Sequence, residues 1–135
     1  MCIQLYSHEP MNDFLFKDEG YQLIGAALEV YNEQGHHLSE DIYQASLEAE
    51  LQRRKIPYDP QFRLDVYYKG IKLKPYFIPD LFVFDEIIVE LKAVKQLIPE
   101  HESQLLNYLA ITGKKVGYLI NFGHKGTLEW KRLVL

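Results

Sequence analysis

The first half of the chain has the hydrophobic spacing of two amphipathic helices. Apolar residues recur at intervals of three and four over residues 18–35, which predicts a helix that ends at Gly35. A second helix is predicted from Ser39, a suitable N-cap, to about residue 54, because Pro57 follows soon afterwards. Apolar and small residues form two adjacent stripes along this second segment, so we expect it to be largely buried.

The pattern then changes to the alternation that is typical of strands. Residues 62–68 alternate between apolar and polar side chains, which predicts a strand with one buried face, and residues 71–73 provide a partner strand. Residues 76–94, YFIPDLFVFDEIIVELKAV, are rich in Ile, Val and Phe and predict a hairpin that turns at Asp85-Glu86. We therefore expect three or four antiparallel strands after the two helices.

A third helix and two further strands complete the predicted elements. Pro99 can begin a helix that Gly113 ends, and the apolar segment 115–121 then favours a strand parallel to a neighbour. Residues 128–135 alternate sufficiently for a last strand. The order ααββββαββ predicts an α/β fold in which a mixed β-sheet is flanked by helices.

Length and composition favour one globular domain. The chain has 135 residues, of which 47% are hydrophobic and 25% charged, so residues 18–135 can build one core behind an N-terminal arm of residues 1–17. No apolar run approaches the length of a membrane span, and the first residues lack the pattern of a signal peptide, so we expect no membrane association and a cytoplasmic location. The net charge of −4 disfavours a wholly basic surface but leaves room for a local basic groove.

Charged residues interrupt the apolar hairpin in a chemically suggestive way. Glu90 and Lys92 share one face of the second strand, and a tight turn would place Asp80 beside Glu90. Asp80, Glu90 and the backbone carbonyl of Leu91 offer hard oxygen ligands, which suit Mg²⁺ or Mn²⁺. Lys92 could then orient or deprotonate a water molecule. The alternative is an ordinary ion pair between Glu90 and Lys92 on the wet face of an edge strand.

Two segments resemble known nuclease motifs. Pro79-Asp80, followed after nine residues by Glu90-Leu91-Lys92, resembles the motif of the PD-(D/E)XK nuclease superfamily. The run EVYNEQGHHLSEDIYQASLEAEL is similar to the opening of the GxxExxY family within that superfamily, although His37 stands where that family has glycine. The matching acid and tyrosine are Glu40 and Tyr43. Without the resemblance, Glu40 would be interpreted as a residue that complements the helix dipole.

A third motif lies on the last predicted helix. The segment from Gln104 to Tyr108 is similar to the QhxxY motif of RecB-like members, in which the glutamine and tyrosine are implied to steady the site or to contact the substrate backbone. His101 shares their helix face and could contact phosphate or move a proton. Lys95 follows the motif strand closely enough to contact a phosphate.

Together these resemblances imply a restriction-endonuclease-like fold and a metal-dependent nuclease, with DNA favoured over RNA. The implied metal ligands are Asp80, Glu90, Leu91 through its carbonyl, and Glu40, with Lys92 beside the attacking water. Gln104, Tyr108, His101, Lys95 and Tyr43 are the expected substrate-binding or site-supporting residues. The alternative is a catalytically inactive module of the same fold that binds nucleic acid or a protein partner. A homodimer is also expected as a possibility, since one small domain offers little surface for gripping a duplex.

Overall fold

The computed structural model describes residues 15–135, and most of the predicted arm, residues 1–14, lies outside them. Within the described residues the helices are α2 (Lys17–Gln34), α3 (Glu40–Arg53) and α4 (Pro99–Thr112). The strands are β1 (Tyr58–Asp59), β2 (Leu64–Tyr68), β3 (Ile71–Phe77), β4 (Leu81–Val83), β5 (Ile87–Lys92), β6 (Val116–Asn121) and β7 (Glu129–Val134). The three predicted helices are thus confirmed within two residues, whereas β1 was not predicted. Every helix in this range is too short or too polar to cross a membrane.

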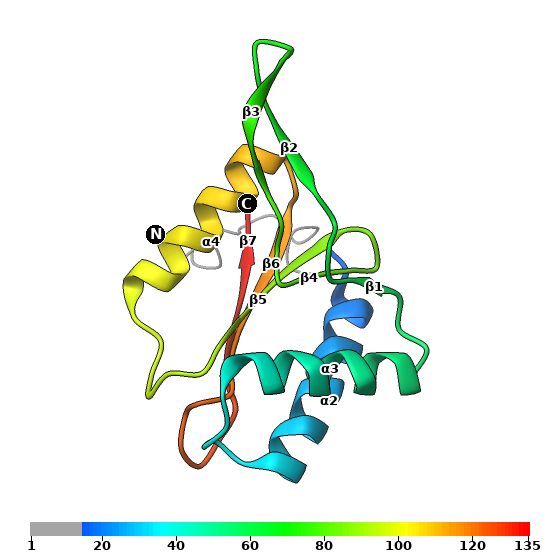
Figure 1. The fold of residues 1–135 in the computed structure, drawn as a ribbon, viewed down its shortest axis with the longest axis vertical. Coiled ribbons are helices and arrows are strands. Elements are labelled where there is room, and N and C mark those ends of the chain that lie inside the picture. Colours follow the sequence, from blue (N-terminus) through cyan, green and yellow to red (C-terminus); the bar gives the residue numbers. More distant parts are fainter. Residues whose placement is uncertain (1–14) are drawn as a thin grey trace.

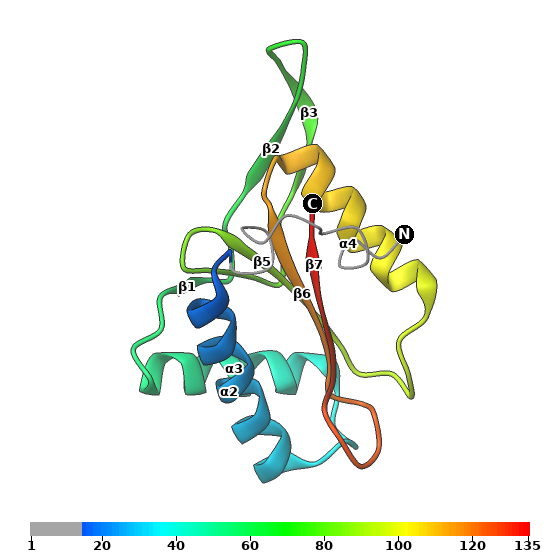
Figure 2. The same ribbon diagram turned by 180° about the vertical axis from the view of Figure 1, so that it is seen from behind.

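The centre of the described structure is a mixed sheet with strand order β1-β4-β5-β6-β7. Strands β5 and β6 run parallel, and the other neighbouring pairs run antiparallel. Helices α2 and α3 lie on one side of the sheet and α4 lies on the other (Figures 1 and 2). This arrangement confirms the predicted α/β architecture.

Strand β5 lies at the middle of the sheet and contributes to both cores. Ile87, Val89 and Leu91 pack with residues of α2 and α3, while Ile88 packs with Leu105 of α4 on the opposite face. All these side chains are fully or almost fully buried, and each such burial contributes about 1.5–3 kcal/mol. The strand is therefore held firmly up to the point where the charged residues begin.

Strands β2 and β3 form a separate two-stranded ribbon, which corrects the prediction of one continuous antiparallel series. The ribbon extends beyond the end of the main sheet (Figure 1). Tyr76 and Phe77 belong to β3, so the first strand of the central hairpin contains only Leu81–Val83. Pro79 accounts for the break, because a residue without a backbone N–H group ends a ladder of hydrogen bonds.

Two burial predictions are also wrong. Leu64 is buried, but Tyr68 on the same face of β2 is 59% exposed, because the ribbon leaves the core. On α3 only Tyr43, Leu47 and Leu51 are buried, and Ile42 is 45% exposed. Helix α3 covers the sheet with one narrow face, and the second stripe that the sequence suggested faces away from the core.

The turn between β4 and β5 sets the register of the central hairpin. Phe84 and Asp85 both have positive φ, and the N–H group of Glu86 donates to the carbonyl of Val83. Two consecutive positive φ angles give the turn a handedness that matches the twist of the strands. The predicted turn is confirmed, centred one residue earlier than expected.

Candidate active site

The central hairpin brings Asp80 and Glu90 together in a reciprocal arrangement. Leu81 pairs with Val89, so Asp80 lies opposite Glu90. The backbone N–H group of Asp80 donates to Oε2 of Glu90 at 2.9 Å, and the N–H group of Leu91 donates to Oδ2 of Asp80 at 2.7 Å. Each carboxylate is therefore oriented by the backbone of the neighbouring strand.

Burial and mutual repulsion raise the pKa of these acids. Burial raises the pKa of Glu90, and the charge of Asp80 adds to this effect, so that the pKa reaches about 7. The pKa of Asp80 is also raised, chiefly by burial. Burial and the charge of Asp80 likewise raise the pKa of Glu40, which stands at the start of α3. The three carboxyls therefore share one electrostatic environment.

Lys92 supplies the positive charge of this environment. Its ammonium group lowers the pKa of Glu40, Asp80 and Glu90, although burial of each acid outweighs this effect. Within residues 15–135 Lys92 forms none of the short ion pairs found elsewhere. The simple Glu90–Lys92 surface pair considered from the sequence is thus absent from the described residues.

The donor set has the chemistry of a site for a hard divalent cation. Two adjacent carboxylates, whose pKa values are raised by burial, would be relieved by a cation between them. In the described part of the chain, however, no three His, Cys, Asp or Glu side chains already form a metal-binding group. Asp80 and Glu90 supply two of the hard oxygen ligands that Mg²⁺ or Mn²⁺ prefers.

Gln44 supports the site and was not identified from the sequence. Its Nε2 donates to the backbone carbonyl of Asp80 at 2.7 Å and to Oε2 of Glu48 at 3.3 Å. Gln44 follows Glu40 by one helical turn and so lies on the same face of α3. That spacing was the signal in the sequence. The hydrogen bond from Gln44 ties α3 to Asp80, the residue just before β4.

Tyr43 fixes the start of α3 from inside the core. It is fully buried, its ring stacks on Phe122 at 4.7 Å, and its hydroxyl donates to the carbonyl of Gly35 at 2.5 Å. The same hydroxyl accepts from the N–H group of Leu38 at 3.2 Å. Gly35 has a φ of 73°, which a glycine adopts without strain. Tyr43 therefore holds the turn that leads to Glu40.

Helix α4 presents the predicted glutamine and tyrosine to the acids. Burial and the charge of Glu90 raise the pKa of Tyr108, while a hydrogen bond with Gln104 lowers it. The ring of Tyr108 stacks on Phe77 at 3.7 Å, at the base of the β2–β3 ribbon. The predicted face of α4 thus adjoins Glu90 and the ribbon.

His101 and Lys95 lie less close to the acids. Nδ1 of His101 accepts a hydrogen bond from the N–H group of Ile98 at 3.1 Å, which caps the N-terminus of α4. Lys95 is exposed in the segment between β5 and α4. In the described residues neither side chain contacts Asp80 or Glu90.

Asn121 secures the chain just after Lys92. It is fully buried at the end of β6, where it pairs with Lys92 in the parallel ladder. Its side chain binds both the N–H group and the carbonyl of Val94 at 2.9 Å. A Cβ atom on Gly123 would meet the Val94 backbone at 2.5 Å, so only glycine permits this close packing. The exit from the charged strand is therefore fixed.

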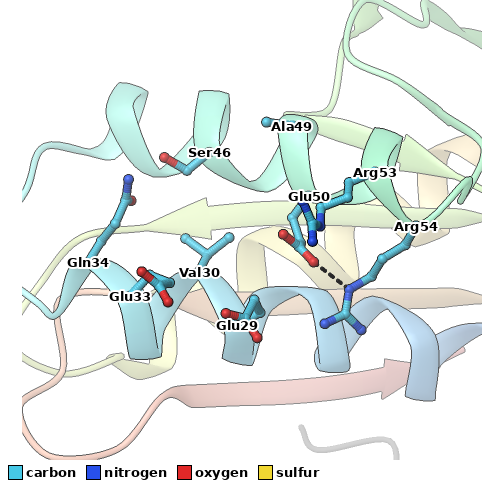
Figure 3. A pocket seen from close by; sticks show the side chains of 9 residues that line it. All are labelled: Glu29, Val30, Glu33, Gln34, Ser46, Ala49, Glu50, Arg53 and Arg54. Carbon is cyan, nitrogen blue, oxygen red and sulfur yellow. Dashed lines mark hydrogen bonds and ion pairs between the residues drawn. The ribbon is translucent and has the colours of Figure 1, made fainter.

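A groove between α2 and α3 is lined by none of these acids. It has a volume of about 750 Å³ and is lined by Glu29, Val30, Glu33, Gln34, Ser46, Ala49, Glu50, Arg53 and Arg54 (Figure 3). Glu50 and Arg54 form an ion pair of 2.7 Å in it. Glu29 lines this groove and does not reach the candidate site.

Comparisons with known proteins agree with this fold. The crystal structure of SSO0001 matches 70% of this chain with a TM-score of 0.55 and 18% identity, a likeness of fold. The match covers 48% of that chain, so this protein spans about half its length. No curated protein matches the sequence. The family model described as the PD-(D/E)XK nuclease superfamily matches residues 17–133. The chain therefore belongs to the PD-(D/E)XK nuclease superfamily.

Proposed function

We propose that this protein is a metal-dependent nuclease that hydrolyses phosphodiester bonds, with DNA favoured over RNA as the substrate. The observation that carries the proposal is the pair Asp80 and Glu90, two carboxyls oriented by backbone N–H groups and adjacent to Lys92. The spacing of Glu40 and Tyr43, with Tyr43 anchored to Gly35, supports membership of the GxxExxY branch.

Asp80, Glu90 and the backbone carbonyl of Leu91 would hold Mg²⁺ or Mn²⁺, with Glu40 as a further ligand. Such a cation, when bound, polarises the phosphoryl oxygen and acidifies water. The arrangement of carboxylates would orient it, because Oε2 of Glu90 and Oδ2 of Asp80 are already fixed by N–H donors. Gln44 would hold the Asp80 segment in place through its backbone carbonyl.

The remaining residues would act on the substrate. Lys92 would orient the attacking water or neutralise charge that develops on the phosphate. Gln104 and Tyr108 would contact the sugar-phosphate backbone from α4. Lys95 and His101 lie farther from the acids and would contact phosphates on either side of the cleaved bond.

A catalytically inactive module that binds nucleic acid or a protein partner is the second candidate. It is favoured by the observation that no three acidic or histidine side chains in the described residues already form a metal-binding group. Divalent metal binding discriminates between the two functions, because an inactive module has no need of the cation.

The test is cleavage of labelled single-stranded and duplex DNA and RNA in Mg²⁺, in Mn²⁺ and in EDTA. We expect cleavage by the wild-type protein only with metal, and a loss of at least about a thousandfold in Asp80→Asn, Glu90→Gln and Lys92→Gln. Glu33→Gln, in the α2–α3 groove, is the matched control and should cleave at the wild-type rate. Cleavage that survives Asp80→Asn and Glu90→Gln would exclude this site as its source.

A further inference from the structure

The β2–β3 ribbon has a net positive charge, although the whole protein is negatively charged. Residues 63–77 contain four cationic side chains and one carboxylate, a net charge of +3. The whole chain carries −4, so the remainder carries −7. A positively charged ribbon on a negatively charged protein points to a polyanionic ligand at that ribbon.

The two faces of the ribbon differ in character. Side chains of cross-strand partners share a face, and Tyr67 pairs with Lys72 while Asp65 pairs with Tyr76. We call this side the cationic face. The pairing assigns it Asp65, Tyr67, Lys72 and Tyr76, with a register shift between the two pairs, and alternation along β3 adds Lys74. Arg63, which precedes β2, joins this face because its guanidinium group lies over the ring of Tyr76. Ion pairs from Asp65 to Arg63 at 2.8 Å and to Lys72 at 3.5 Å agree with the assignment.

The opposite face anchors the ribbon. Leu64 is buried in the core beside α4, and Phe77 stacks on Tyr108 at 3.7 Å. These contacts lie at the base of the ribbon, which extends away from the main sheet in both views (Figures 1 and 2). Because the apolar face is turned toward α4, the cationic face is turned away from the core and remains open to a ligand.

Tyr67 is the aromatic side chain that is best placed to stack on a base. It is 60% exposed, and none of the aromatic stacks or cation–π contacts among the described residues involves its ring. The ring of Tyr76 is already covered by Arg63 at 4.1 Å, and Lys69 lies over the ring of Tyr68 at 5.5 Å. Lys72 stands directly across from Tyr67.

The base of the ribbon also lies next to the candidate active site. Only Ile78 and Pro79 separate the end of β3 from Asp80. At the base of the ribbon, Phe77 touches Tyr108, whose pKa is raised in part by Glu90. The base of the ribbon is therefore close to the acids, both along the chain and through α4.

We propose that the cationic face of the ribbon binds a single-stranded nucleic-acid segment, with a base stacked on Tyr67 and phosphates at Lys72 and Lys74, and guides it to Asp80 and Glu90. This inference rests on the proposed nuclease function. Single strands are favoured because an exposed ring can stack on an unpaired base, whereas a base within a duplex is covered on both faces. Stacking on a tyrosine tolerates any sequence, and the lysines supply the salt-dependent part of the affinity.

The experiment measures binding of a fluorescent single strand of about 20 nucleotides by anisotropy, in EDTA to prevent cleavage, with a matched duplex as competitor. We expect Tyr67→Ala to weaken single-strand binding about tenfold, and Tyr67→Phe, which retains the ring, to bind within about twofold of wild type. Lys74→Ala should reduce the slope of log K against log salt by about 0.7, the value for one phosphate contact on a single strand.

Matched controls come from exposed residues far from the ribbon. Tyr21→Ala on α2 and Lys125→Ala between β6 and β7 should bind as wild type. No measurable single-strand binding by wild type at about 100 μM would overturn the inference. Equal affinity of Tyr67→Ala, Tyr67→Phe and wild type would do the same. A different outcome in sedimentation is a wild-type dimer that Tyr67→Ala dissociates, with no oligonucleotide bound. That result would assign the cationic face to a second copy of the chain.

Cleavage assays separate this inference from the proposed function. If the wild type binds single strands through Tyr67 but cleaves nothing in Mg²⁺ or Mn²⁺, the ribbon inference stands and the nuclease proposal fails. If the wild type cleaves and Tyr67→Ala leaves KM and single-strand affinity unchanged, the nuclease proposal stands and the ribbon inference fails.

Discussion

Acidic side chains cluster in two regions of the molecule, and their interactions differ between the two. In the α2–α3 groove, Glu50 pairs with Arg54 at 2.7 Å, and further glutamates line an open surface (Figure 3). At the candidate active site, Asp80 and Glu90 accept hydrogen bonds from backbone N–H groups, and burial raises their pKa values.

Because of this difference, we place the candidate site at the buried acids and not in the groove. The groove has a volume of about 750 Å³, but its exposed ion pair contributes only about 0–1 kcal/mol and needs no functional explanation. A half-buried carboxylate without a counter-ion is costly to maintain. We therefore expect ligands of opposite charge to act at Asp80 and Glu90 and to leave the groove unaffected.

The largest expected difference between the two regions is in Mn²⁺ affinity. Asp80→Asn and Glu90→Gln should each weaken Mn²⁺ binding at least about a hundredfold, because a neutral amide replaces a charged oxygen ligand. Titration calorimetry of the full chain measures this loss. Glu33→Gln is the control in the groove. A similar loss of Mn²⁺ affinity in that variant would show that the acids of the two regions do not differ in metal binding.

The next difference is in the pH dependence of metal-free stability. The pKa of Glu90 is about 7 in the folded protein against an ordinary value of 4.5, so the folded state binds its proton more tightly. The stabilisation of the folded state by this tighter proton binding is complete below about pH 4.5. It is lost as the pH rises through about 7, which lowers the free energy of unfolding by about 3 kcal/mol. Urea denaturation in EDTA should show stability falling over this interval.

Glu90→Gln provides the matched variant for this measurement. Its amide oxygen can still accept from the N–H group of Asp80, but it has no proton to lose. The difference in unfolding free energy between variant and wild type should grow in favour of the variant from about pH 5 to pH 8. A constant difference across that range would show that the carboxyl titrates in the same way in the folded and unfolded states.

Much of the fold was predictable from local pattern. The helix ends at Gly35 and Gly113 follow from residues that adopt positive φ, and the parallel strand after α4 follows from the short connection. The ribbon could not be assigned to its own sheet, because the alternation in residues 62–68 predicts a strand but does not show to which sheet that strand belongs. Pro79 is the sequence signal for the break between β3 and β4, although it also belongs to the nuclease-like motif.

The candidate site was predictable where it depended on strand register and less so where it depended on packing. The position of Asp80 beside Glu90 follows from the hairpin turn, as expected. Gln44 shares a helix face with Glu40, but its partner could not be predicted, because the carbonyl of Asp80 is a backbone group that no sequence pattern marks. Likewise, the role of Tyr43 in holding the turn at Gly35 depends on a tertiary hydrogen bond.

Tyr43 stands on α3, between the two regions, and its hydroxyl offers a smaller test. Tyr43→Phe should destabilise the protein by about 1–2 kcal/mol, because the carbonyl of Gly35 and the N–H group of Leu38 lose their partner. It should also reduce activity through displacement of Glu40, while the Glu50–Arg54 ion pair in the groove is unaffected. The midpoint of urea denaturation gives the first effect, and the rate at saturating substrate gives the second. Unchanged activity with reduced stability would show that Tyr43 stabilises the core but does not position Glu40.

The smallest effect is expected from the ion pair in the groove. Arg54→Ala removes the contact with Glu50, a pair spaced i, i+4 on α3 whose arginine side chain is 37% exposed. Such pairs contribute about 0.3–0.5 kcal/mol, and salt screens them, so the variant and wild type should converge in stability at high ionic strength. Urea denaturation at low and high salt measures this, and Mn²⁺ affinity should be equal in both proteins. A loss of metal affinity in Arg54→Ala would instead couple the groove to Asp80 and Glu90 through α3, and the contrast between the two acidic regions would no longer hold.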